Sequence, residues 1–106
     1  EGLPTLIDAS TTWLEKAAGD YWVAAGDAAA AFDPLSSHGM ATALWSGRAS
    51  GRAIDRVLSG DPDGLVEYSI QMQSGVRSFL KQRQKIYGME QRFREEAFWQ
   101  RRHREI

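Results

Sequence analysis

The pattern of apolar and polar residues divides the chain into an N-terminal part with strand character and a C-terminal part with helical periodicity. Residues 4–14, "PTLIDASTTWL", mix β-branched and apolar residues, a composition typical of an extended strand. A second run, "YWVAA" at 21–25, lies between two Gly-Asp pairs, and these boundaries favour a short buried strand. Because two strands do not form a stable sheet alone, we expect them to need strands from outside this chain.

From residue 39 the apolar positions recur every three or four residues, which is the period of one helix face. This stripe predicts a helix of roughly five turns that buries the face and ends at Ser59-Gly60. Two glycines on a buried stripe cost a helix up to ~1 kcal/mol each relative to alanine, so we expect another element to cross there at close range. The stripe consists of Met40, Leu44, Gly47, Gly51, Ile54 and Leu58.

A second helix is predicted to begin at Asp61-Pro62, an N-cap followed by a proline, and to run to Tyr87 or Gly88. The short link makes it the antiparallel neighbour of the first helix. Residues 95–106 predict a short final helix with Glu95 and Glu96 in its first turn. The fold class is therefore α+β and mainly α: one or two short strands, a long antiparallel helix pair and a short C-terminal helix. The second stripe consists of Leu65, Ser69, Met72, Val76, Phe79, Arg83 and Ile86, with Tyr68, Leu80 and Tyr87 beside it, and Phe98 and Trp99 anchor the last helix.

Composition narrows the function classes only slightly. The chain has 106 residues and a net charge of -1, but nine of its 13 Lys and Arg residues follow residue 63. Since these charges alternate in sign, we interpret them as a solvated helix face and expect no nucleic-acid partner. The absence of cysteine excludes disulfides, thiolate metal sites and cysteine nucleophiles, and it fits a cytoplasmic location. No apolar run approaches the ~18 residues of a membrane span, so no membrane partner is expected.

Candidate chemistry is concentrated in "AAGDAAAAFDPLSSHGMATAL", residues 24–44. Asp27 follows a predicted strand, and ligands of open α/β folds bind at the carboxyl ends of strands. Its carboxylate can accept hydrogen bonds from sugar or polyol hydroxyls. Pro34 forces a turn, after which the free N–H groups of a helix start favour electron-rich ligand atoms. Small residues and a capped helix also occur in proteins that bind nothing, and this alternative stays open on the residues alone.

The stretch "WVAAGDAAAAFDPLSSHGMATAL" resembles the second FAD-binding motif of the flavin-dependent monooxygenase and halogenase superfamily. That motif is a strand, Gly-Asp-Ala, Asp-Pro and a glycine that opens a long helix. "GRASGRAI" and "FWQRRH" resemble the C-terminal helices of the halogenase-like branch. The resemblance implies an origin in an FAD-binding α/β (Rossmann-like) oxidoreductase, with Asp27 on the ribityl chain. The cofactor-binding residues that it implies are Gly26, Asp27, Pro34, Ser36, Ser37, His38, Gly39 and Met40, the last two through their backbone.

Three departures from the family pattern refine this interpretation. Ser36 stands where tryptophan halogenases have a glutamate, so "DPLSSHGM" is more similar to the hydroxylases and the quinone-cofactor maturases. The family's first motif, GxGxxG, is absent, and so is the halogenase Trp-x-Trp-x-Ile-Pro motif. We therefore expect a C-terminal fragment in which residues 1–38 carry the strands and the second FAD motif, and residues 39–106 form a helical segment.

The resemblance implies a full-length parent that hydroxylates or halogenates an aromatic or amino-acid side chain through a flavin hydroperoxide. The fragment is expected to be inactive, to retain no FAD and to self-associate. Its expected partners are the missing N-terminal FAD-binding part and, as a further candidate, a flavin reductase. The alternative function is a non-enzymatic helical interaction module, and a nucleic-acid binder ranks third. His38 either tunes the flavin or is a turn residue, whereas His103 is expected to be solvated.

Overall fold

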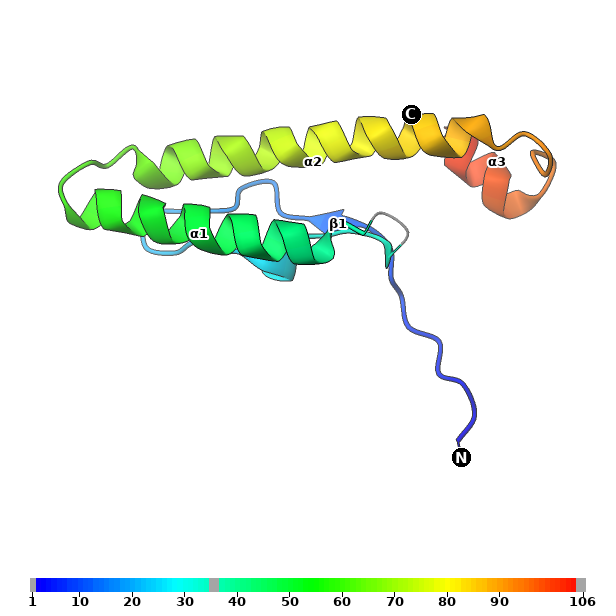
Figure 1. Ribbon diagram of the computed structural model, residues 1–106, viewed down its shortest axis with the longest axis horizontal. Coiled ribbons are helices and arrows are strands. Elements are labelled where there is room, and N and C mark those ends of the chain that lie inside the picture. The colour runs from blue at the N-terminus through cyan, green and yellow to red at the C-terminus, as the bar shows by residue number, and fades with distance from the viewer. Residues whose placement is uncertain (1, 35–36, 105–106) are drawn as a thin grey trace. The chain divides into compact units, whose positions relative to one another are not determined.

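The computed structural model describes residues 2–34 and 37–104, which fall into two compact units, Glu1–Gln73 and Ser74–Ile106. The first unit contains the strands β1 (Thr12–Trp13) and β2 (Ala30–Ala31), the 3-10 helix η1 (Gly26–Ala28) and the helix α1 (Gly39–Leu58). The helix α2 (Gly64–Met89) begins in the first unit and continues into the second, where α3 (Ala97–Arg104) follows (Figure 1). The mainly helical α+β class is therefore confirmed.

The sheet is much smaller than the sequence predicts. Strands β1 and β2 pair antiparallel, with Thr12 opposite Ala31 and Trp13 opposite Ala30. The prediction of a strand over residues 4–14 is wrong except for its last residues, because nothing in the described chain pairs with residues 4–11. The predicted strand at 21–25 is reduced to one bridge between Ala18 and Val23. The second strand falls instead in the alanine run, where small side chains fit a tightly packed position.

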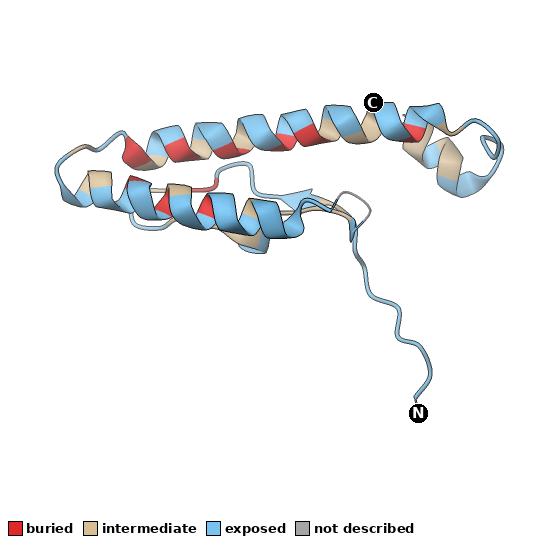
Figure 2. Cartoon of the chain, viewed as in Figure 1, coloured by how far each residue is buried: buried red, intermediate tan, exposed pale blue. Residues whose placement is uncertain are grey.

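The bounds of α1 agree with the prediction, but the face that it buries does not. Ser59 follows the last helical residue, and Gly60 adopts a φ of +99°, a left-handed conformation that suits glycine. Met40, Leu44 and Leu58 are 84%, 78% and 81% exposed. The side that packs on the chain itself carries smaller residues, and Figure 2 shows the buried positions of α1 on one side of the helix. They are Ser46, Ser50 and Ala53.

The core of the first unit lies between this small-residue face, the first turns of α2 and the N-terminal segment. Tyr68 is 2% exposed, and its hydroxyl donates a hydrogen bond of 2.6 Å to the Ala24 carbonyl oxygen. The Ala17 N–H donates to Ser69 Oγ at 3.2 Å. These two hydrogen bonds hold the irregular segment that contains Ala17 and Ala24 against α2. The buried apolar residues of this unit are Ala17, Ala18, Ala29, Ala30, Ala53, Tyr68 and Met72.

Helix α2 begins at Gly64, two residues after Pro62, and Asp61 accepts both from Arg56 of α1 and, through Oδ1, from the Asp63 N–H at 3.1 Å. The Arg56 guanidinium donates to Asp61 Oδ2 from Nε at 2.8 Å and from Nη2 at 2.6 Å. The first intrahelical carbonyl is that of Asp63, which accepts from the Glu67 N–H at 2.9 Å. The predicted stripe is confirmed at Met72, Val76, Phe79 and the adjacent Tyr68 and Tyr87, but Ile86 is exposed.

The second unit is built around Tyr87, near the end of α2. Trp99 of α3 meets the Tyr87 ring edge-on, with the ring centroids 6.0 Å apart, which confirms Trp99 as an anchor. His103 Nε2 lies 2.9 Å from the Tyr87 carbonyl oxygen, so the expectation of a merely solvated histidine is wrong. Helix α3 begins at Ala97, and Glu95 and Glu96 precede it instead of forming its first turn.

Candidate functional site

The centre of the candidate site is the Gly26-Asp27 turn, which the structure fixes against α1. Gly26 has a φ of +59°, so the backbone turns here in the left-handed region. Its N–H donates to Ser46 Oγ at 2.8 Å, and its carbonyl accepts from the Ala29 N–H at 3.0 Å. A Cβ built on Gly26 would lie 3.9 Å from the Ala43 side chain. The Gly26-Asp27 turn therefore packs against α1 at a defined position, the second helical turn.

Asp27 projects from this turn into solvent. It is an exposed residue within η1 and the one acidic residue of that short helix. No hydrogen bond or ion pair holds its carboxylate within residues 2–34 and 37–104. A carboxylate that is fixed by its backbone and unused by its own chain can accept hydrogen bonds from the hydroxyl groups of a ligand.

The connection from Pro34 to Met40 is the second part of the site. Leu35 and Ser36 lie outside the described residues, so the predicted role of Ser36 has no structural counterpart. Ser37 has a φ of 55°, which is uncommon for a residue with a side chain. The His38 ring meets Phe32 edge-on at 6.1 Å between centroids, and the His38 carbonyl accepts from the Thr42 N–H at 2.9 Å.

The start of α1 presents backbone N–H groups that receive no side-chain cap from the N-cap residue. His38 occupies the N-cap position but its side chain does not cap the helix, and no acidic residue stands in the first turn. A Cβ added at Gly39 would meet none of the described residues within 4 Å. Met40 is exposed as well. Such a helix start carries partial positive charge and donors that suit electron-rich ligand atoms.

The structure thus brings the acid-bearing turn and the helix start to the same end of α1, because Gly26 contacts α1 one turn after Gly39 and Met40. Sequence reasoning missed the two residues that fix this arrangement. Ser46 accepts the Gly26 N–H, and Tyr68 holds the Ala24 carbonyl from α2. The sequence signal for Ser46 is a serine among small residues on a helix, a pattern too common among helices to single it out.

Comparison with known proteins gives one relevant similarity. The chain is 37% identical over 84 residues to a protein of Marinomonas mediterranea named "Putative FAD-dependent oxidoreductase LodB". The match takes in 79% of this chain, and it spans 22% of the length of that relative. The similarity supports a relationship to FAD-dependent oxidoreductases, while nothing in the name indicates the halogenase or maturase branch. No family model matches the chain. No solved structure matches it either.

Within the described ranges, no helix has the length and apolar character that crossing a bilayer requires.

Proposed function

We propose that this chain is the C-terminal part of an FAD-dependent oxidoreductase and that residues 26–40 complete its flavin site. The observation that carries the proposal is the pairing of a fixed, unused carboxylate at Asp27 with an uncapped helix start at Gly39. The 37% identity to a protein named as an FAD-dependent oxidoreductase supports it independently of the geometry.

The residues at the site fit the two parts of a flavin cofactor. Asp27 would accept hydrogen bonds from the hydroxyl groups of the ribityl chain. The N–H groups of Gly39 and Met40 would donate to the oxygen and nitrogen atoms of the ring, and the open space at Gly39 leaves room for a close approach. Gly26, Pro34, Ser37 and His38 would shape the path between these groups.

When bound, FAD would supply the redox chemistry by which the whole protein hydroxylates or halogenates an aromatic or amino-acid side chain. In this proposal the chain's own residues bind and orient the cofactor. Ser46 and Tyr68 are positioning residues, because they hold the Gly26 turn and the segment before it without facing the ligand. The sequence "DPLSSHGM" favours the hydroxylase and maturase-like branch over the tryptophan halogenases.

The FAD-binding part of the same protein is the proposed partner of α1. Met40, Leu44 and Leu58 lie along an exposed face with Gly47 and Gly51 between them, and a Cβ at either glycine would meet nothing within 4 Å. Large apolar residues around two glycines suit another polypeptide that approaches closely. Docking of the FAD-binding part there would also bring it beside residues 26–40.

The same face supports a second candidate function, a non-enzymatic helical interaction module. Its positions are symmetric about Ala49: Met40 mirrors Leu58, Leu44 mirrors Ile54, and Gly47 mirrors Gly51. In an antiparallel pair of identical helices each residue would meet its mirror partner, as a two-fold interface requires. The two candidate functions differ in whether flavin binding by the full-length protein depends on residues 26–40.

The decisive experiment replaces Asp27 with alanine in the full-length flavoprotein that the proposal requires. Loss of hydrogen bonds to a charged acceptor is worth ~1.5–3 kcal/mol, so the flavin affinity should fall by about tenfold or more. Flavin absorbance per protein measures this, and Asp20→Ala, an exposed aspartate outside the turn, is the matched control. Equal flavin content in both variants would reject the assignment and favour the interaction module. The isolated chain is expected to be colourless.

A further inference from the structure

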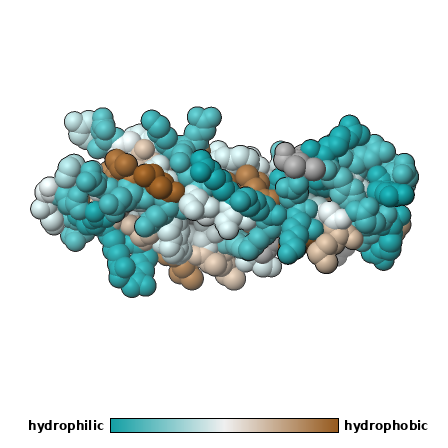
Figure 3. Space-filling model, turned by 90° about the horizontal axis from the view of Figure 1, so that it is seen from above, coloured by the Kyte–Doolittle hydropathy of each residue, from teal (hydrophilic) through white to brown (hydrophobic). Residues whose placement is uncertain are grey.

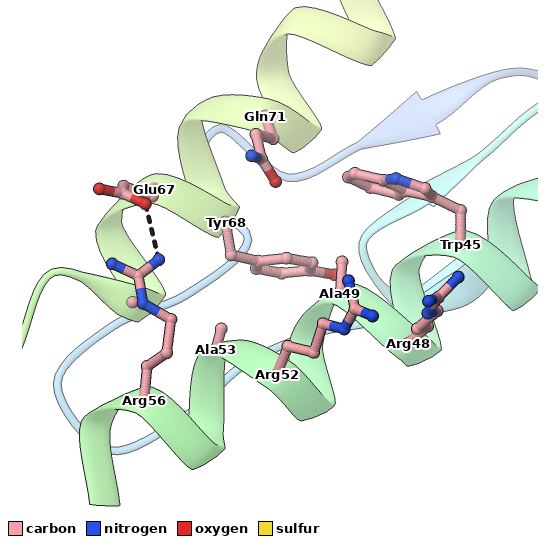
Figure 4. A pocket seen from close by; sticks show the side chains of 10 residues that line it. Trp45, Arg48, Ala49, Arg52, Ala53, Arg56, Glu67, Tyr68 and Gln71 are labelled. Atoms are coloured by element: carbon pink, nitrogen blue, oxygen red, sulfur yellow. Dashed lines mark hydrogen bonds and ion pairs between the residues drawn. The ribbon is translucent and has the colours of Figure 1, made fainter. Parts of the chain in front are cut away.

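A hollow between α1 and the first turns of α2 is not used by the proposed flavin site. It lies entirely within the first unit and has a volume of about 370 Å³, within the range typical of small-molecule sites. Figure 4 shows that α1 supplies one wall and α2 the other. The lining residues that matter for its chemistry are Trp45, Arg48, Arg52, Arg56, Glu67 and Tyr68.

Three arginines follow one another along the α1 wall at intervals of four residues, so they lie on successive turns of one side. Arg56 is already paired: it donates to Glu67 Oε2 from Nη1 at 2.6 Å and holds Asp61 as described above. These hydrogen bonds, first that to Glu67 and then that to Asp61, raise the pKa of Arg56. Arg56 therefore has little capacity left for a ligand.

Arg48 and Arg52 are different. Neither has a hydrogen bond or an ion pair with any residue that the structure describes. Figure 4 shows both side chains on the wall of the hollow, at the end away from Glu67. The charge along the hollow is thus uneven: at one end Arg56 is paired with two carboxylates, whereas the end where Arg48, Arg52 and Trp45 lie is positive.

An aromatic surface stands at the same positive end. The Trp45 ring stacks on Tyr68, with centroids 6.2 Å apart and an angle of 17° between the planes. Tyr68 cannot turn freely, because it is buried and its hydroxyl is bonded to the Ala24 carbonyl. Trp45 is supported by this ring yet remains 45% exposed. It therefore offers a fixed, accessible indole within the same hollow as two unpaired guanidinium groups.

We propose that this hollow binds a small planar ring that carries a carboxylate or a phosphate. The forked guanidinium groups of Arg48 and Arg52 match the two oxygens of such an anion, and the indole of Trp45 matches the ring. Glu67 disfavours a second anionic group at the far end, so ligands with one terminal anion fit best. This inference goes beyond the proposed flavin site, since none of residues 26–40 lines the hollow.

The test is a titration of the 15N-labelled 106-residue chain, followed by amide shifts in NMR spectra. The probes are adenosine monophosphate and benzoate, which distinguish a phosphate source from a carboxylate source. Adenosine supplies the ring alone and inorganic phosphate the anion alone. We expect at least one of the first two probes to shift amides within 45–56 and 64–71 saturably, at concentrations about tenfold below those of adenosine or phosphate.

Variants locate the effect. Arg52→Gln should weaken binding of the active probe by about tenfold, the effect expected for losing hydrogen bonds to a charged group. Arg52→Lys should weaken it less, because it keeps the charge and loses the fork. Arg77→Gln removes the same charge outside the hollow and should change nothing. The proposal is overturned if neither ring-bearing anion binds, if phosphate alone binds as well as they do, or if Arg77→Gln weakens binding as much as Arg52→Gln.

Discussion

The two long sides of α1 differ in what they are made of and in what they meet. The inner side carries Ser46, Ser50 and Ala53, and it is buried against the chain itself. The outer side carries Met40, Leu44 and Leu58, and it is exposed. In a self-contained small protein the larger apolar side would be expected inside. Burial within the described chain thus follows fit to the small residues of the Gly26 turn and to Gly64, and the apolar side of α1 stays uncovered by the described residues.

Exposed apolar residues are not confined to α1. Val66 and Ile70 of α2 are 58% and 59% exposed. Figure 3 shows hydrophobic side chains among hydrophilic ones on the face that it presents. What distinguishes the outer side of α1 is the regular spacing of its apolar residues and the two glycines at its centre.

The largest expected effect comes from crowding the inner contact. A Cβ on Gly64 would lie 2.6 Å from the Ala53 carbonyl oxygen, so Gly64→Ala forces α1 and the start of α2 apart. We expect a loss of about 1–3 kcal/mol in the free energy of unfolding, measured by urea denaturation. Gly75→Ala in the same helix is the control, since its Cβ would meet nothing within 4 Å and should stabilise by roughly 0.5–1 kcal/mol. Similar values for both variants would mean that the inner contact is loose.

The next effect concerns the bond that holds the N-terminal segment to α2. Tyr68→Phe removes the hydroxyl that donates to the Ala24 carbonyl at 2.6 Å. The free energy of unfolding should fall by about 1 kcal/mol, the usual net value of such a bond. Tyr21→Phe makes the same chemical change at a fully exposed residue and should stay within ~0.5 kcal/mol of the parent chain. Thermal unfolding of both variants measures this. Equal stability of Tyr68→Phe and Tyr21→Phe would mean that the Tyr68 hydroxyl does not stabilise the fold.

A substitution on the outer side of α1 should increase the free energy of unfolding instead of lowering it. Gly51→Ala replaces the poorest non-proline helix former with the best, and the added Cβ meets nothing within 4 Å. The isolated chain should become more stable by up to ~1 kcal/mol, measured by urea denaturation. In the longer flavoprotein the same change should weaken the association of α1 with the FAD-binding part, because the close approach is lost. Destabilisation of the isolated chain by Gly51→Ala would show that its own residues already cover the outer side.

The sequence predicted the helices well because their signals are local. The regular spacing from Met40 to Leu58 and the Ser59-Gly60 stop indicate the correct bounds of α1. The face that is buried could not be predicted, since apolar periodicity reports which side prefers burial and not which polypeptide supplies the cover. The strands were overestimated for the same reason: "PTLIDASTTWL" has strand composition, but a strand needs a neighbour to pair with. Within the described chain only Thr12 and Trp13 of this stretch are paired as strand residues.

The residues proposed for the candidate site stand out in the sequence, whereas the residues that support them do not. Asp27 and Gly39 stand out in the sequence because an acid and a helix-opening glycine flank a turn. Their common position at one end of α1 depends on a hydrogen bond between Gly26 and Ser46, which are distant in sequence. Contacts over such separations have no periodic signal in a single sequence. The arginine-lined hollow was not predicted either, because Trp45 of α1 stacks there on Tyr68 of α2, a contact between residues far apart in the sequence.

If the outer side of α1 is an interface, the isolated chain should associate through it. Light scattering should show the mass of a dimer at high micromolar concentration, because the uncovered side can pair with its mirror image on a second copy. Leu44→Glu should give a monomer with unchanged helical content. Val66→Glu, the same change at an exposed apolar residue of α2, should remain dimeric. An unsubstituted chain that stays monomeric would contradict this assignment of the outer side as an interface. So would a Leu44→Glu variant that dimerises as well as the Val66→Glu variant.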